Sequence, residues 1–170
     1  MTSPSHPATT LSDLVRVDYF RAVASVAATD GFVDRSEVAK LHRLAAVLSI
    51  PADVADAQIA AVQKGAGQGR ALLVATIRDD VPVRTSLMMD SLVIALADGK
   101  LAPGESKALG GLARDLGMSR EAMIRLAAFV EKVVSNKESD AQVLARDLGT
   151  TLDAGQTIGW LAWARQGAAF

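Results

Sequence analysis

Two acidic turns with the same spacing are the residues of this chain that could do chemistry. Asp30-Gly31 is followed by Glu37, and Asp98-Gly99 is followed by Glu105, so both copies read Asp-Gly-x5-Glu and begin 68 residues apart (98 − 30). Clustered carboxylates are the ligands that hard divalent cations such as Ca²⁺ and Mg²⁺ prefer. The pattern therefore suggests a metal site, and Asp34 inside the first turn is a further candidate ligand.

The spacing resembles the second half of an EF-hand loop, where glycine occupies the sixth place and glutamate the twelfth. Counted back from the glycine, the first and third ligand places of the first copy fall on Val26 and Ala28. Those of the second copy fall on Ile94 and Leu96. Because these side chains cannot bind calcium, neither turn is an EF-hand.

Two interpretations of the acidic residues remain. The candidate metal ligands are Asp30, Asp34, Glu37, Asp98 and Glu105. If the two copies pack about a pseudo-two-fold axis, the turns face each other and their carboxylates surround one Ca²⁺ or Mg²⁺. Alternatively, the acidic residues only accept hydrogen bonds from the free amides at helix starts, where the helix dipole also favours negative charge.

The elements that position these turns are helices. Apolar residues recur at helical spacing along the chain, and the second copy repeats the buried stripe of the first. Leu109, Leu112, Ala113 and Leu116 match Leu41, Leu44, Ala45 and Leu48 at the same offset of 68. The pattern predicts an all-α fold, a single bundle of about seven or eight helices with two related helical units.

We expect three parts in the chain. Residues 1–11 are rich in Ser, Thr and Pro and are predicted to be a disordered tail. Residues 12–134 form the helical domain with the internal duplication, and residues 135–170 form a C-terminal helical extension that packs on it. The extension carries both tryptophans, Trp160 and Trp163, which either cover an open side of the bundle or form a docking tail for a partner or membrane surface.

Composition excludes several classes of protein. The net charge is −1 and no basic stripe is present, which argues against nucleic acid as a partner. The absence of cysteine excludes disulfides, thiolate metal sites and a cysteine nucleophile. The uncharged apolar stretches fall far short of the roughly 20 residues that a transmembrane helix needs. We therefore expect a cytoplasmic protein without a transmembrane segment.

Catalytic residues are scarce. His6 lies in the predicted tail, and His42 lies on a helix without the spacing of a metal ligand pair, so it is interpreted as a surface residue. Asp90 stands in an otherwise apolar helix. It either forms a buried ion pair, for which Arg21 and Arg84 are candidate partners, or turns toward the acidic turn at Asp98. We expect no enzymatic activity.

The segments Val23–Pro51 and Leu92–Met118, which contain Ala27-Ala28-Thr29-Asp30-Gly31 and Ala95-Leu96-Ala97-Asp98-Gly99, resemble the two motifs of TerB-like tellurite-resistance proteins. The resemblance covers about residues 14–135. It implies an all-helical fold with two similar halves, a bacterial origin and a role in tellurite or general stress resistance. It also implies metal binding by the acidic motif residues, which here are Asp30, Glu37, Asp98 and Glu105.

The function expected from these observations is that of a non-enzymatic bacterial stress or tellurite-resistance protein that binds a divalent metal through its acidic interhelical turns. The alternative is a helical adaptor for protein–protein interaction, in which the acidic residues act only as helix caps. Domains similar to this one occur beside co-chaperone modules, which is compatible with a protein partner. Peripheral membrane association and the oligomeric state are left open.

Overall fold

The computed structural model describes residues 5–29, 31–65, 70–96, 101–146, 148 and 153–167. Within these residues the chain forms helices and no strand, which confirms the all-α prediction. A short 3-10 helix, η1 (Pro7–Thr10), comes first. The α-helices are α1 (Asp13–Ala27), α2 (Arg35–Val47), α3 (Ala52–Gln63), α4 (Arg70–Ile77), α5 (Val81–Ala95), α6 (Pro103–Asp115), α7 (Arg120–Val134), α8 (Glu138–Arg146), α9 (Ala154–Gly159) and α10 (Ala162–Gly167).

Short polar side chains start several of these helices. The residue before the helix accepts a hydrogen bond from an amide in the first turn, which satisfies a donor that has no partner within the helix. The pairs are Ser12 with Val15 in α1, Asp80 with Val83 in α5, Ser119 with Ala122 in α7 and Asp153 with Gln156 in α9.

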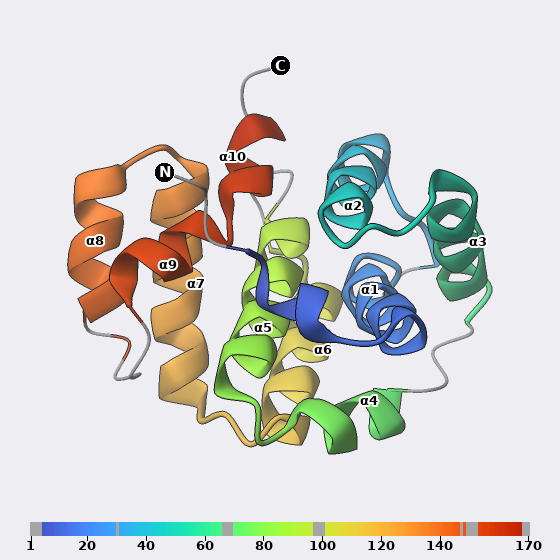
Figure 1. Ribbon diagram of the computed structural model, residues 1–170, viewed down its shortest axis with the longest axis horizontal. Coiled ribbons are helices and arrows are strands. Elements are labelled where there is room, and N and C mark those ends of the chain that lie inside the picture. Colours follow the sequence, from blue (N-terminus) through green and yellow to red (C-terminus); the bar gives the residue numbers. More distant parts are fainter. Residues whose placement is uncertain are drawn as a thin grey trace.

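Helix α5 is the centre of the bundle. Every residue from 85 to 95 is buried, as expected for a helix that is apolar on nearly all sides. Helices α1 and α7 pack against it, and α6 follows it as an antiparallel neighbour (Figure 1). The two buried serines of α5, Ser86 and Ser91, donate to the carbonyls of Val83 and Leu87 in the preceding turn, so their hydroxyls need no other partner.

The N-terminal segment differs from the disordered tail that we expected over residues 1–11. The described part of it, residues 5–11, contains η1, which packs on α1 and α5. His6 and Ala8 are buried there. A run of Ser, Thr and Pro suggests disorder, but among the described residues of this run Pro7 and His6 become part of the packed core.

The C-terminal helices cover one side of the bundle. Helix α8 packs on α7, α9 packs on α8, and α10 contacts both α2 and α7 (Figure 1). Trp160 and Trp163 are buried in this region. The two tryptophans therefore contribute to the core, as in the first of the two interpretations offered for them.

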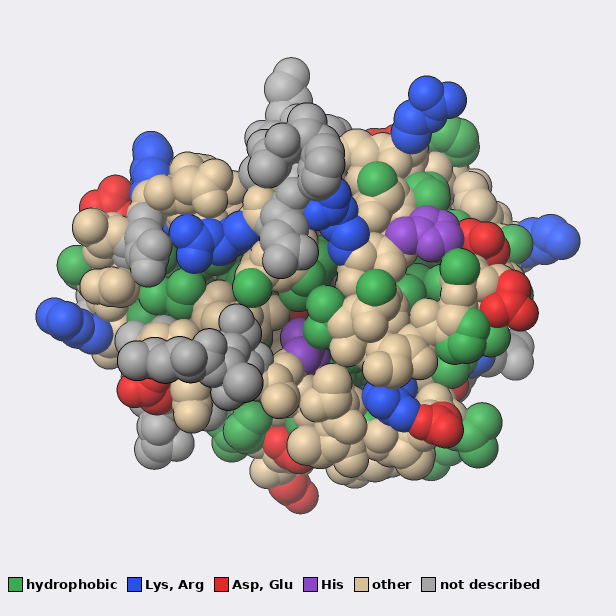
Figure 2. Space-filling model, turned by 45° about the horizontal axis from the view of Figure 1, so that its top comes forward, with side chains coloured by type: hydrophobic (Ala, Val, Ile, Leu, Met, Phe, Trp, Pro, Cys, Tyr) green, Lys and Arg blue, Asp and Glu red, His purple; other side chains and the backbone are tan. Residues whose placement is uncertain are grey.

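The surface carries charges of both signs. On the face shown in Figure 2, basic and acidic side chains are interspersed with apolar ones, and no large area of one sign is visible. None of the helices in the described ranges is long and apolar enough to cross a bilayer.

Candidate functional site

The helices that flank the two acidic turns occupy equivalent positions along the chain. Helix α5 begins and ends 68 residues after α1, and α6 begins and ends 68 residues after α2. The matched apolar residues of α2 and α6 are all buried. The two turns therefore separate equivalent pairs of helices, α1 and α2 in the first copy and α5 and α6 in the second.

The first turn is a reciprocal helix cap. The Oδ1 atom of Asp34 accepts a hydrogen bond from the amide of Glu37 at 2.8 Å, and the Glu37 carboxyl accepts one from the amide of Asp34. This is the capping box that the spacing of these two residues predicts. The capping role is thus present in α2, whereas α6 begins after Ala102, which has no side-chain cap.

Glu37 is more than a cap, because its side chain is buried. Only 8% of the residue is exposed. Its Oε2 atom is inaccessible to water and has no hydrogen-bond partner among the described residues. A buried carboxylate oxygen without a partner is costly, and structures rarely keep one without a reason.

Described residues beside the two turns lie close together. A Cβ atom placed on Gly104, the residue before Glu105, would lie 3.1 Å from Oγ1 of Thr29, the residue before Asp30. Helix α6 packs on α1 at this point. The charge of Glu105 also acts on Glu37. The fold thus brings Glu37 and Glu105, from the two turns, into one acidic cluster with Asp34.

The pKa of Glu37 is raised from 4.5 to about 8. Burial is the largest cause, followed by the hydrogen bond and the charge of Asp34, and then by the charge of Glu105. Each of these effects disfavours the ionised carboxylate. Near neutral pH the cluster therefore retains a proton on Glu37.

Asp30 and Asp98, the aspartates of the two Asp-Gly pairs, lie outside the described residues. Of the five candidate ligands, the structure therefore describes Asp34, Glu37 and Glu105. Within the described part of the chain, no group of three or more His, Asp or Glu side chains is arranged to hold a metal ion.

A second polar cluster lies inside the bundle, and the sequence indicated only part of it. Asp90 is fully buried, and its Oδ2 atom accepts hydrogen bonds from Nε2 of His6 at 2.9 Å and from the hydroxyl of Tyr19 at 2.6 Å. The Tyr19 hydroxyl also lies 2.9 Å from Oγ of Ser86. Burial and the nearby Asp90 charge raise the pKa of Tyr19, so it remains a hydrogen-bond donor.

These contacts correct the expected partners of Asp90. Arg21 bonds to Gln58 on α3 and pairs with Asp18, and Arg84 donates to the carbonyl of Arg78. Arginine would have had to bury its guanidinium beside Asp90, which is costly. Because Nδ1 of His6 accepts the amide hydrogen of Ala8, the proton of the imidazole is on Nε2 and a neutral ring meets the carboxylate.

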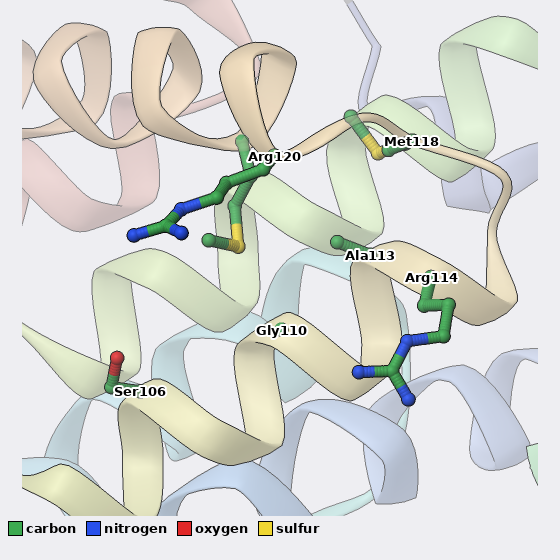
Figure 3. Close-up of a pocket in the computed structure, with 7 residues that line it drawn as sticks. Ser106, Gly110, Ala113, Arg114, Met118 and Arg120 are labelled. Carbon is green, nitrogen blue, oxygen red and sulfur yellow. The ribbon is translucent and has the colours of Figure 1, made fainter.

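Two surface hollows contain arginines that the sequence did not single out. The first, of about 420 Å³, lies between α6 and the start of α7 (Figure 3). The second, of about 710 Å³, lies between α4 and α6. Arg114 lines both. The signal in the sequence was weak, since these arginines are far apart along the chain.

A family model described as tellurite resistance protein TerB matches residues 16–128, which is more than half of the chain. Comparison with curated proteins and with solved structures found no match. The matched range includes both acidic turns, most of α1 and all of α2 to α6. The chain belongs to the TerB family of tellurite resistance proteins.

Proposed function

We propose that this chain is a non-enzymatic bacterial stress protein of the tellurite-resistance type, built from two related helical units whose acidic turns bind a divalent cation. The ligands proposed are Asp30, Asp34, Glu37, Asp98 and Glu105. The observation that carries the proposal is the Oε2 atom of Glu37, which is buried without a hydrogen-bond partner among the described residues and lies close to further carboxylates.

A cation would resolve the electrostatic conflict in this cluster. Glu37 meets the like charges of Asp34 and Glu105 and is withdrawn from water, so it holds a proton instead of ionising. A divalent cation offers the positive charge that the cluster lacks and takes carboxylate oxygens as ligands. Binding would displace the proton from Glu37, and affinity should therefore rise with pH as Glu37 ionises.

The test follows the melting temperature of the full chain with and without Ca²⁺, Mg²⁺ or Zn²⁺ at pH 7.0 and 8.5. A ligand at 100 times its dissociation constant adds about 2.7 kcal/mol of stability. We expect at least one of these ions to raise the melting temperature, and to raise it more at the higher pH. The double variant Glu37→Gln plus Glu105→Gln should lose this shift, and so should Asp98→Asn plus Glu105→Gln.

A matched control is available on the same fold. Asp53 and Glu121 stand in the first turns of α3 and α7, exposed and likewise 68 residues apart. Asp53→Asn plus Glu121→Gln removes two carboxylates from helix starts outside the cluster and should leave the cation effect intact. The proposal fails if no ion stabilises the chain, or if the Glu37 and Glu105 variants respond like wild type.

The non-enzymatic part of the proposal is supported by the burial of the cluster of His, Tyr, Ser and Asp side chains found among the described residues. His6, Tyr19, Ser86 and Asp90 are each 4% exposed or less, so a substrate could not reach them in this conformation. Their contacts instead join His6, which caps η1, and Tyr19 of α1 to Asp90 of α5.

The adaptor remains the alternative, and the capping box formed by Asp34 and Glu37 is the observation that favours it. In that case the acidic residues only stabilise helix α2, and cations have no effect. If the chain is an adaptor, the segment that carries Trp160 and Trp163 is not its docking element, because both tryptophans are buried.

A further inference from the structure

The two hollows on the α4, α6 and α7 side form one surface, which we call the arginine groove. It is defined by Arg70 and Arg78 of α4, Arg114 of α6 and Arg120 of α7. Because Arg114 lines both hollows, they lie on either side of one side chain. The groove follows α6 from Ser106 to Asp115, and its arginine of that helix, Arg114, is in the last turn, whereas Glu105 of the acidic cluster is in the first turn.

The hollow between α6 and α7 combines charge with an apolar lining. Ala113, Met118 and Met123 supply the apolar part, and Gly110 leaves the helix backbone bare. Figure 3 shows Arg114 and Arg120 on different sides of this hollow, with their guanidinium groups separate from each other. The two cations therefore do not clamp a single small anion. The guanidinium groups of Arg114 and Arg120 are instead placed to pair with two separate acidic groups of one extended ligand that lies between them.

The charge of the groove is not neutralised by the rest of the described structure. Arg78, Arg114 and Arg120 are exposed, and their guanidinium groups take part in none of the ion pairs or hydrogen bonds found among the described residues. Arg70 pairs with Asp115 at 2.7 Å, and its Nε atom is buried without a partner in the described part of the chain. Four cations thus face one carboxylate.

A ligand of the groove must carry negative charges at several separate positions, and it must also have an apolar group that packs on the methionines. A small molecule would engage one hollow and leave the other arginines unused. Nucleic acid is disfavoured by the net charge of −1 and by Asp115 within the groove. Methionine adapts its shape to varied apolar side chains. Arginine pairs with carboxylates through two parallel hydrogen bonds.

We propose that the arginine groove binds an acidic peptide segment of a partner protein. An aliphatic or aromatic side chain of the segment enters the hollow lined by Met118 and Met123. Aspartate or glutamate side chains on either side pair with Arg114 and Arg120, and further carboxylates pair with Arg70 or Arg78. The side chains proposed to contact the peptide do not include any of the proposed cation ligands, so separate variants test the two sites.

The test begins with a displayed library of random peptides that is selected for binding to the full chain. We expect the enriched sequences to share several acidic residues around one apolar residue. The most enriched peptide is then synthesised with a fluorescent label, and its dissociation constant is measured by anisotropy. Arg114→Ala and Arg120→Ala should each weaken binding by about tenfold or more, because each removes a charge-assisted contact.

Two further variants separate binding from folding. Gly110→Leu places a side chain in the hollow, where a Cβ atom meets nothing within 4 Å, and leucine also favours the helix. It should block the peptide without lowering the melting temperature. Arg125→Ala is the matched control, because Arg125 is an exposed arginine of α7 that lines neither hollow. It should bind the peptide like wild type.

Three results would overturn the proposal. In the first, selection enriches no acidic sequences. In the second, the selected peptide binds equally well to the Arg114, Arg120 and Gly110 variants. In the third, a twelve-residue oligothymidylate or inorganic phosphate displaces the peptide at equal concentration and loses affinity in the same variants, which would make the groove a general phosphate site.

Discussion

At the residue scale, Glu37 serves two roles that oppose each other. Its carboxyl completes the cap of α2, which favours a negative charge at the helix start. The same carboxyl is buried near Asp34 and Glu105, which disfavours that charge. The second influence prevails, since the pKa rises to about 8. A surface cap would not behave in this way.

This shift makes the stability of the protein depend on pH. The pKa of Glu37 is higher in the folded chain than in the unfolded chain. Below about pH 4.5 the carboxyl is protonated in both states, and the stabilising effect of the proton is fully present. Above this pH the unfolded chain loses the proton, whereas the folded chain keeps it until about pH 8. Between these values the free energy of unfolding should fall with rising pH, by at most about 1.4 kcal/mol per pH unit. Glutamine mimics the protonated carboxyl and does not titrate.

We therefore expect Glu37→Gln to match wild type within about 0.5 kcal/mol at pH 4.5 and to be more stable by a few kcal/mol at pH 9. Urea titrations followed by circular dichroism at several pH values measure this difference. A constant difference between the two proteins across the range would show that Glu37 does not hold the proton.

At the element scale, α2, α6 and α7 end in the same way. The residue after the cap has a positive φ, 57° at Ser49, 73° at Gly117 and 59° at Asn136. The next amide then donates back to the last turn, from Ile50 to the carbonyl of Ala45 and from Met118 to that of Ala113, both at 2.8 Å. These are Schellman-type ends, in which glycine is the favoured residue.

Ser49 is the poorer choice at its position, because a side chain at positive φ costs about 1 kcal/mol or more. Ser49→Gly should therefore stabilise the protein by about 0.5–1 kcal/mol, and Gly117→Ser should destabilise it by about 1 kcal/mol. A Cβ atom at Gly117 would lie no closer than 3.5 Å to Arg78, so backbone strain alone sets this cost. Equilibrium unfolding in urea measures the change in stability of both variants. Changes of the same sign would contradict the interpretation of these helix ends as Schellman-type.

At the scale of the whole molecule, segments from both ends of the chain complete the core around α5. The N-terminal residue His6 reaches Asp90 across 84 positions of sequence. At the other end, helix α10 packs on α2 and α7, and its residue Trp163 is buried. Long-range contacts of this kind join the described N- and C-terminal segments to the core.

Trp163→Ala should accordingly cost about 3–5 kcal/mol, as large-to-small changes of buried aromatic residues do. Removing Leu152–Phe170 should lower the urea midpoint of the entire helical signal instead of leaving a stable remainder. Val143→Ala, at an exposed position of α8, is the control and should change stability by about 0.5 kcal/mol or less. A truncated chain as stable as the full one would show that the tail is free to dock elsewhere.

The helices themselves were predictable because their signals are local. Apolar spacing and capping residues such as Ser12, Asp34 and Ser119 set where helices begin, and they do so within a few residues of sequence. The capping box of Asp34 and Glu37 depends on a spacing that is equally local. The family resemblance rested on motifs of equally short range, and the match over residues 16–128 agrees with it.

The partners that lie far apart were not predictable, because no local pattern encodes them. The sequence marked Asp90 as an anomaly, but only tertiary packing chose His6 and Tyr19 over the nearby arginines, since a neutral donor is cheaper to bury than a guanidinium. Packing of α6 against α1 likewise brought Glu37 close to Glu105 and raised its pKa. By itself, the sequence determined the helices, their ends and the acidic turns; tertiary structure decided which of these carboxylates meet, because burial and proximity arise only when distant helices pack together.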